Sequence, residues 1–235
     1  MGIVKVSIFQ KSLQEGLNLT TYKKIAALKS DFLLMPEYFF ADQSVKNYRS
    51  LPDKSMFAHD WLLKLNDSYK GIILGGSIVR SSKDGQFASS PVVSEGALVD
   101  YYDKRDLNAE EKKVVKAGEG PGVFILGGFR FGVLLGGETK NPRYIEELVE
   151  QGIRIIFIMD TRADFDEAED EEYILKPAAK HGLYITRCCG TGRLFGAEIR
   201  GRSLVASPTG ISWRVAPQET DQEILKTILI NMVGV

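Results

Sequence analysis

Short apolar runs alternate with amphipathic stretches along this chain. Val4, Val6 and Ile8 are separated by polar residues, which is the two-residue period of a half-buried strand. Continuous apolar runs predict more deeply buried strands at residues 32–35, 71–79, 129–135, 153–159 and 183–188. Apolar residues at helical spacing predict helices near 14–29, 54–69, 142–151 and 169–181, and the stripe of the second is Met56, Phe57, Trp61, Leu62 and Leu65.

Turn residues add antiparallel strands to this pattern. Two turn-forming segments, 94–96 and 207–210, each lie between two short apolar runs and so predict two hairpins. The tail, 223–233, fits a strand or a helix, and its periodicity does not decide between them. Strand–helix–strand units together with hairpins predict an α/β protein whose sheets are neither all parallel nor all antiparallel. No shift in composition divides the chain, so we expect one domain over residues 1–235.

The composition narrows the class of partners without identifying one. The chain has 235 residues, 44% of them hydrophobic, and a formal net charge of −1. Charge therefore gives no reason to expect a nucleic acid or an anionic membrane as partner, and no apolar run reaches the roughly 18 residues that span a bilayer. The two cysteines, Cys188 and Cys189, are adjacent and form neither a disulfide framework nor a zinc motif. We expect a cytoplasmic protein without a bound metal or cofactor.

Three segments carry residues that could do chemistry. Glu37 follows a buried apolar run and a proline. Lys104 follows a predicted strand and stands within a run of charged residues. Gly136 and Gly137 end a third apolar run, just before a predicted helix. Each segment alone has an ordinary explanation: a carboxylate that caps a helix, a solvated charged surface and a tight turn.

The order of these segments carries a resemblance to a known family. From about residue 3 to 215 the chain resembles the nitrilase superfamily of carbon–nitrogen hydrolases, which includes amidases and nitrilases. The matching blocks are Pro36-Glu37, Gly75-Gly76-Ser77-Ile78, Tyr102-Asp103-Lys104, Glu111 with Gly118, Gly132-Val133-Leu134-Leu135 with Pro142, and Gly201-Arg202-Ser203 through Pro208-Thr209-Gly210. The resemblance implies a four-layer α-β-β-α sandwich of two mixed sheets.

The resemblance also implies roles for individual residues. In that family a glutamate is the general base, a cysteine attacks the carbon of an amide or nitrile, and a lysine stabilises the developing oxyanion. Carried over, Glu37 would be the base and Lys104 the electrophilic group. Glu111 would be a second carboxylate that orients Lys104 or the ligand. The residues expected to contact the ligand are Tyr38, Gly137 and Glu138.

The position of the nucleophile is where the chain departs from the family. Gly136 stands where the resemblance places the cysteine, and a glycine cannot form a thioester. Thr139 lies three residues further on and has no evident base. Strand alternation turns Cys188 and Cys189 to opposite faces, so one of them could face the pocket, although a buried cysteine is more often inert. Lys180 stands where the family commonly has a glutamate.

Four interpretations of function remain open. The first is a catalytically impaired homologue that binds a small amide, amine or carboxylate ligand. The second is an active amidohydrolase in which Glu37 activates water directly. The third is a non-catalytic interaction subunit, and the fourth is a nucleophile knockout of an active amidase. Because the family commonly pairs two sandwiches through a helical face, we expect a homodimer that uses the helix near 142–151.

Overall fold

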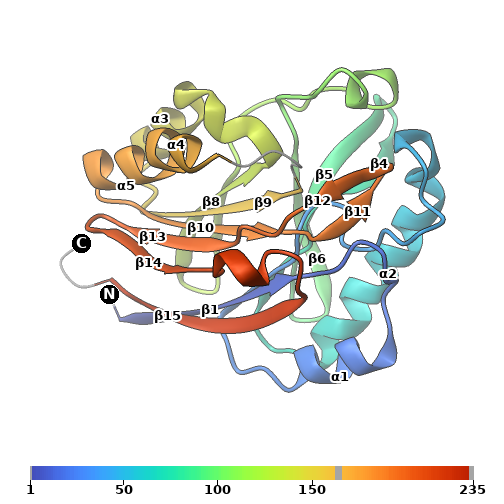
Figure 1. Ribbon diagram of the computed structural model, residues 1–235, viewed down its shortest axis with the longest axis horizontal. Coiled ribbons are helices and arrows are strands. Elements are labelled where there is room, and N and C mark those ends of the chain that lie inside the picture. The colour runs from blue at the N-terminus through green and yellow to red at the C-terminus, as the bar shows by residue number, and fades with distance from the viewer. Residues whose placement is uncertain (1, 162–165, 233–235) are drawn as a thin grey trace.

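Two β-sheets pack face to face at the centre of the molecule, and helices lie on the outer face of each (Figure 1). The computed structural model describes residues 2–161 and 166–232. The layers follow the order helix, sheet, sheet, helix. The expected four-layer α-β-β-α sandwich of two mixed sheets is therefore confirmed.

Seven strands of the described residues form the first sheet. Strands β1, β2 and β3 are mutually parallel, whereas the other pairings in this sheet are antiparallel. Helical crossovers join the parallel strands and short turns join the antiparallel ones, which produces a mixed sheet. The strand order is β15 (Ile224–Asn231), β1 (Ile3–Gln10), β2 (Phe32–Leu34), β3 (Ile72–Leu74), β5 (Gly85–Ser94) and β4 (Ile78–Ser82), with β6 (Ala97–Asp103) paired to β5.

Six strands of the described residues form the second sheet. Its centre is parallel, because β9 pairs in parallel with both β8 and β10, and its edges are antiparallel. The strand order is β14 (Gly210–Arg214), β13 (Leu204–Ser207), β10 (Tyr184–Cys189), β9 (Ile155–Asp160), β8 (Phe129–Leu135) and β7 (Val123–Leu126). A separate small hairpin consists of β11 (Gly192–Leu194) and β12 (Ala197–Ile199).

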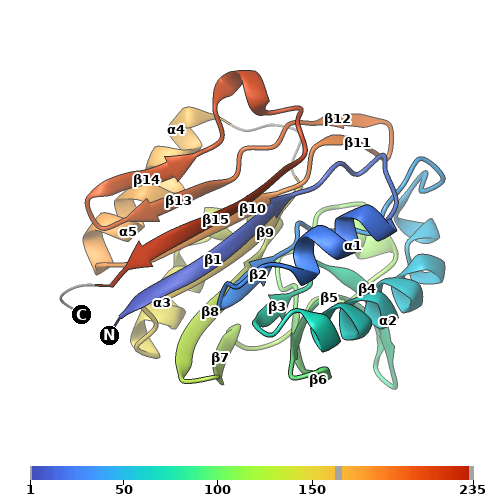
Figure 2. The ribbon, with the colours of Figure 1, turned by 90° about the horizontal axis from the view of Figure 1, so that it is seen from below.

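Helices cover both outer faces of the sandwich (Figures 1 and 2). On the first sheet these are α1 (Leu19–Ala26) and α2 (Pro52–Ser68), and on the second they are α3 (Pro142–Glu150), α4 (Glu167–Asp170) and α5 (Lys176–His181). A π-helical turn, Glu171–Leu175, joins α4 to α5. Across residues 2–161 and 166–232, no helix has both the length and the apolar character that crossing a membrane requires.

Three apolar clusters fill the spaces between the four layers. Side chains of β2 alternate between two of these clusters: Leu33 faces the helical side, while Phe32 and Leu34 face the other sheet. Between the sheets, the ring of Phe32 lies 5.1 Å from that of Phe131 and 4.7 Å from that of Phe157, measured between ring centroids. These aromatic contacts join β2 of one sheet to β8 and β9 of the other and fix how the strand ends meet.

Local details of two helices differ from the sequence prediction. Helix α1 begins only at Leu19, because the side chain of Asn18 accepts a hydrogen bond from the Thr21 amide and caps it there. In α2, Met56 is 75% exposed and Phe57 is 60% exposed, so they do not belong to the buried stripe. The residues of α2 that are buried are Ser55, Ala58, Leu62, Leu65 and Asn66.

The secondary structure of the C-terminal tail is set by its pairing with β1. Strand β15 pairs antiparallel with β1 over eight residues, from Gln10 opposite Ile224 to Ile3 opposite Asn231. The sequence left a strand or a helix open for residues 223–233, and the structure shows a strand. Val233, the last residue of that segment, lies outside the described residues.

Candidate active site

The ends of four strands meet at one side of the sandwich, and each is followed by a residue that faces a common pocket. Glu37 follows β2 of the first sheet and Lys104 follows β6. Gly136 and Thr161 follow β8 and β9 of the second sheet. The carboxyl ends of neighbouring parallel strands are the usual place for a ligand site in α/β folds.

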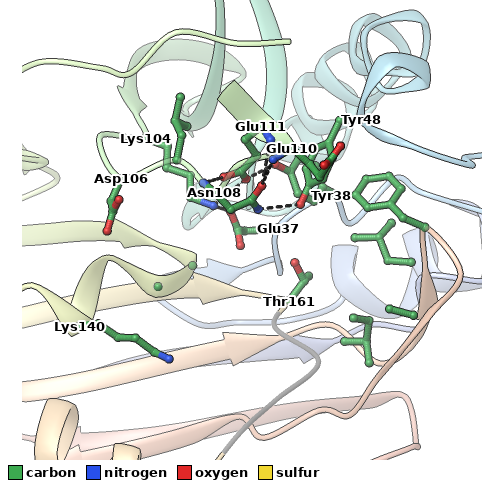
Figure 3. A pocket seen from close by; sticks show the side chains of 17 residues that line it. Glu37, Tyr38, Tyr48, Lys104, Asp106, Asn108, Glu110, Glu111, Lys140 and Thr161 are labelled. Atoms are coloured by element: carbon green, nitrogen blue, oxygen red, sulfur yellow. Dashed lines mark hydrogen bonds and ion pairs between the residues drawn. The ribbon is translucent and has the colours of Figure 1, made fainter. Parts of the chain in front are cut away.

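A buried ion-pair triad lies at the base of this pocket. The Lys104 Nζ donates a hydrogen bond to Glu37 Oε1 at 2.9 Å and to Glu111 Oε1 at 2.7 Å. All three residues are at most 4% exposed, and Figure 3 shows their side chains converging. The structure thus brings together the three charged residues that the sequence singled out.

Two further groups hold Glu111 in place. The hydroxyl of Tyr38 donates to Glu111 Oε1 at 2.8 Å, and the amide of Asn108 donates to Glu111 Oε2 at 2.9 Å. The Tyr38 backbone has a φ of 53°, which is unusual for a residue with a side chain. Because several hydrogen bonds fix Glu111, this carboxylate can hold Lys104 in one position.

One ammonium faces two carboxyl groups in the triad, so its charges cancel only while one of the carboxyl groups carries a proton. Burial raises the pKa of Glu37, Lys104 lowers it, and Glu111 raises it again, with the result that this pKa lies at about 8. Burial lowers the pKa of Lys104, but Glu37 and Glu111 more than offset this effect, so this pKa lies above its ordinary value. Lys104 therefore remains charged at neutral pH, while Glu37 is able to take up and release a proton.

Gly136 lies directly beside this triad. Its φ of 54° is in the left-handed region, and a Cβ built there would lie 2.8 Å from Lys104 Nζ and 2.9 Å from Glu37 Oε2. Nothing lies within 4 Å of a Cβ built on the neighbouring Gly137. A side chain at 136 would therefore touch both the carboxylate and the ammonium, whereas one at 137 would enter open space.

The pocket around the triad has a volume of about 520 Å³, which is in the usual range for a small-molecule site. Tyr38 and Gly137, which the sequence analysis expected to contact a ligand, both line it. The sequence analysis did not identify several other lining residues, among them Tyr48, Asp106, Asn108, Lys140, Thr161 and Phe195. Asp106 and Asn108 lie in the same loop as Lys104, whereas the other four come from different segments, so no single spacing along the chain connects the set.

Comparison with solved structures identifies the architecture. The fold aligns with a mutant of the amidase of Nesterenkonia sp. AN1 at a TM-score of 0.81, over 97% of this chain and 90% of that one, at 14% identity. It aligns with Nit3 of Saccharomyces cerevisiae, a member of the nitrilase superfamily, at a TM-score of 0.79, over 98% and 91%, at 18% identity. The chain has the nitrilase-superfamily fold.

A third neighbour places the same nitrilase fold within a longer chain. It is the glutamine-dependent NAD+ synthetase of Acinetobacter baumannii, with a TM-score of 0.82 and 16% identity, and the match covers 98% of this chain but 46% of that one. No family model matches the sequence, and no curated protein sequence matches it. The likeness of this nitrilase-fold chain to its neighbours is therefore one of structure.

Glu138 occupies a different place in this nitrilase fold from the one expected. It does not line the pocket but is fully buried beneath it. Its carboxylate accepts hydrogen bonds from the Tyr102 hydroxyl at 2.9 Å and from the amides of Leu135 at 2.7 Å and Arg105 at 2.6 Å. These donors occupy the carboxylate, so Glu138 fixes the turn after β8 rather than facing the pocket.

None of the other nucleophile candidates lines the pocket. Cys188 is buried between the sheets, where its thiol contacts the backbone carbonyls of Phe9 and Leu34 at 3.3 Å, and burial raises its pKa far above the ordinary value. Neither Cys189 nor Thr139 lines the pocket. Both cysteines are thus inaccessible to a ligand held beside Lys104.

The described residues contain no group of three or more metal-binding side chains in a suitable arrangement. At the triad, the ammonium of Lys104 already stands between the carboxylates of Glu37 and Glu111. It therefore occupies the position that a bound cation would take.

Proposed function

We propose that this protein is a catalytically impaired homologue of carbon–nitrogen hydrolases that binds a small amide, amine or carboxylate ligand. The observation that carries the proposal is the backbone of Gly136, which lies beside Lys104 and Glu37 where a nucleophilic side chain would stand. Without a side chain there, the residue supplies no atom that can attack a carbonyl carbon and form a covalent intermediate.

The remaining residues support binding and polarisation of such a ligand. In this proposal Lys104 would offset negative charge on a ligand oxygen, Glu37 would accept a proton, and Glu111 would orient Lys104. Tyr38 and Gly137 would contact the ligand. The structure of the Nesterenkonia amidase variant has the acetamide moiety of fluoroacetamide added at its active site cysteine. The present chain, on this proposal, retains the charged pocket and lacks that covalent step.

The proposal predicts ligand binding without amide turnover. We expect small primary amides to raise the melting temperature, because a ligand that binds only the folded state stabilises it. We expect no release of carboxylic acid above the uncatalysed rate in a mass-resolved assay. A Glu37→Gln variant should behave like the original chain in that assay. Acid release that requires neither Glu37 nor a cysteine would overturn the site assignment.

One observation favours direct attack by water as a second candidate. Glu37 Oε1 is bonded to Lys104, whereas Oε2 has no hydrogen-bond donor among the described residues and lies 2.9 Å from the Cβ position of residue 136. A carboxylate whose pKa lies at about 8 is suited to act as general base near neutral pH. Turnover that Glu37→Gln abolishes, and that persists without Cys188 and Cys189, would favour this candidate.

We also propose that two copies pair through α3 to form a homodimer. Of this helix, Ile145 and Leu148 are buried within the subunit, and the other face remains available for a partner. Light scattering at tens of micromolar protein, chosen to exceed typical dimer Kd values, should give twice the mass of the chain. Substitution of exposed Glu146 by Arg should shift the protein toward monomer. A monomer at that concentration would refute the pairing.

A further inference from the structure

One oxygen of the triad faces the pocket without a partner among the described residues. Glu37 is 3% exposed, and no donor among the described residues reaches its Oε2. Lys104 Nζ borders the same space, since both atoms lie within 3 Å of the Cβ position of Gly136. A buried acceptor beside a donor is satisfied by a ligand group that both donates and accepts a hydrogen bond. The head of the ligand therefore belongs beside Gly136.

The rest of the pocket has an excess of negative charge. Its lining includes four carboxyl groups, those of Glu37, Asp106, Glu110 and Glu111, and two ammonium groups, those of Lys104 and Lys140. Glu110 is paired with Lys113 and Lys140 with Glu169, and both partners lie outside the pocket. The excess negative charge therefore comes from Asp106, and also from the triad once Glu37, with its pKa of about 8, has lost its proton. Among the described residues no cation lies within ion-pair distance of Asp106. A low-dielectric pocket with this charge balance attracts cations and repels anions.

Two tyrosines, Tyr38 and Tyr48, stand across the pocket from Lys140 and Asp106 (Figure 3). Together with Phe195 they form an aromatic wall, in which the ring centroids of Tyr48 and Phe195 lie 4.3 Å apart. Tyr38 lies 5.8 Å from Tyr48 and 6.2 Å from Phe195. An aromatic face attracts an organic cation, and Asp106 faces this wall from the opposite side of the pocket.

The turn that carries Phe195 is built against local preference. Leu194 pairs with Ala197, so Phe195 and Gly196 are the two central residues of the hairpin loop, with φ of 52° and 84°. Such turns favour Asn, Asp or Gly at the first central position. Tyr38, in the same wall, also has a positive φ. Unfavourable backbone at residues that line one pocket points to a role for these rings in binding rather than in folding.

We propose that the pocket selects ligands with a cationic tail: a small amide-like head beside Gly136 and an organic ammonium group against the wall of Tyr38, Tyr48 and Phe195. This specificity rests on the proposed function, because it assumes that the pocket binds a small ligand. The net negative charge sets the preference for a cation, and the aromatic faces supply its contact surface. An anionic tail meets repulsion from Asp106.

Three probes with a common primary amide test the charge of the tail. They are 4-aminobutyramide, butyramide and succinamate, whose far ends are cationic, neutral and anionic. Calorimetric titration at pH 7.5 and low salt should give a Kd about ten-fold lower for 4-aminobutyramide than for butyramide, and succinamate should bind most weakly. Because exposed charges are screened by salt, the preference should shrink at 0.5 M NaCl.

Single substitutions test whether the preference for a cationic tail depends on the aromatic wall and on Asp106. Phe195→Asn, which suits the turn, should bring the Kd of 4-aminobutyramide close to that of butyramide. Asp106→Asn should reduce the same difference, and Glu119→Gln, at an exposed carboxylate outside the pocket, should leave it unchanged. Circular dichroism establishes that each variant is folded.

The outcomes separate this specificity from the proposed function. If butyramide or succinamate binds as tightly as 4-aminobutyramide, the specificity is wrong while ligand binding stands. If none of the three probes binds at millimolar concentration, the proposed function fails and the specificity fails with it. A preference that survives Phe195→Asn, Asp106→Asn and high salt would also overturn the assignment to this wall.

Discussion

Substitution of Gly136 by Cys is expected to create a thiol that iodoacetamide labels rapidly and selectively. A Cβ at this position lies within 3 Å of Glu37 Oε2 and Lys104 Nζ, so the sulfur would stand beside a proton acceptor and a cation. A neighbouring ammonium lowers the pKa of a thiol and increases the fraction of reactive thiolate. We expect labelling at residue 136 at least about ten-fold faster than at an ordinary exposed cysteine.

Amide turnover by the same variant should recover only in part. On the proposed function, Gly136→Cys places a nucleophile beside its base. Because the members of such a set act as a unit, completing the set can raise the rate of amide hydrolysis by roughly 10³- to 10⁶-fold. However, the introduced cysteine would need a left-handed backbone, and its Cβ would press on Lys104 Nζ at 2.8 Å. Both effects displace the sulfur from the line of attack, and a displacement of about 1 Å can reduce a rate about 100-fold.

Peptide mass analysis after labelling decides this prediction. Gly136→Ala supplies the same Cβ without sulfur, and the original chain gives the background from buried Cys188 and Cys189. Adding Glu37→Gln to Gly136→Cys should slow labelling, because the proton acceptor is gone. Labelling of position 136 at the rate of a solvent-exposed cysteine, with or without Glu37, would show that the residue does not face this base.

Substitution of Lys104 by Met is expected to destabilise the folded protein by about 3–5 kcal/mol, since it leaves buried carboxylates without their cation. Glu37 is 3% exposed and Glu111 is 1% exposed, so water cannot replace the ammonium at 2.9 and 2.7 Å. The half-exposed pair of Lys140 with Glu169 is the matched control. There, Lys140→Met should cost less than about 1 kcal/mol.

The loss caused by Lys104→Met should depend on pH. Lys104 is the group that lowers the pKa of Glu37, so without it this pKa rises further above its unfolded value. A carboxyl group with a raised folded pKa stabilises the folded state at low pH and loses that contribution as pH rises. The deficit should therefore be larger at pH 8 than at pH 5. Urea denaturation at both values measures it, and a deficit independent of pH would contradict this account.

The sequence predicted the strands that bury both faces and the charged residues that follow them. The apolar run that ends at Leu135 and the one before Glu37 are local signals, because short continuous apolar runs bounded by turn residues are typical of buried strands. The triad was predictable because each member stands within a block that resembles the family: Glu37 and Lys104 follow strands, and Glu111 begins a 3-10 turn. In contrast, the tail acquires its strand only by pairing with β1, a contact between opposite ends of the chain that local periodicity does not encode.

Buried polar residues account for most of what the sequence did not reveal. Ser55 of α2 is buried because its hydroxyl accepts from the Val79 amide at 2.9 Å and donates to the Leu51 carbonyl at 3.0 Å. The neighbouring Met56 is apolar and yet exposed, so the predicted apolar stripe of α2 was wrong at this position. Glu138 was expected at the ligand, and the contacts that bury it instead include Tyr102 and Arg105, which lie in a segment distant in sequence.

The left-handed backbone at position 136 makes glycine less costly to the folded state than any residue with a side chain. A left-handed conformation costs a residue with a Cβ roughly 1–2 kcal/mol, and glycine is free of this strain. Replacing a nucleophile here by glycine would thus end the chemistry while favouring the fold, whereas the reverse step must overcome strain. Loss of Lys104 would endanger folding itself. Folding energetics therefore tolerate glycine at position 136 better than the loss of Lys104.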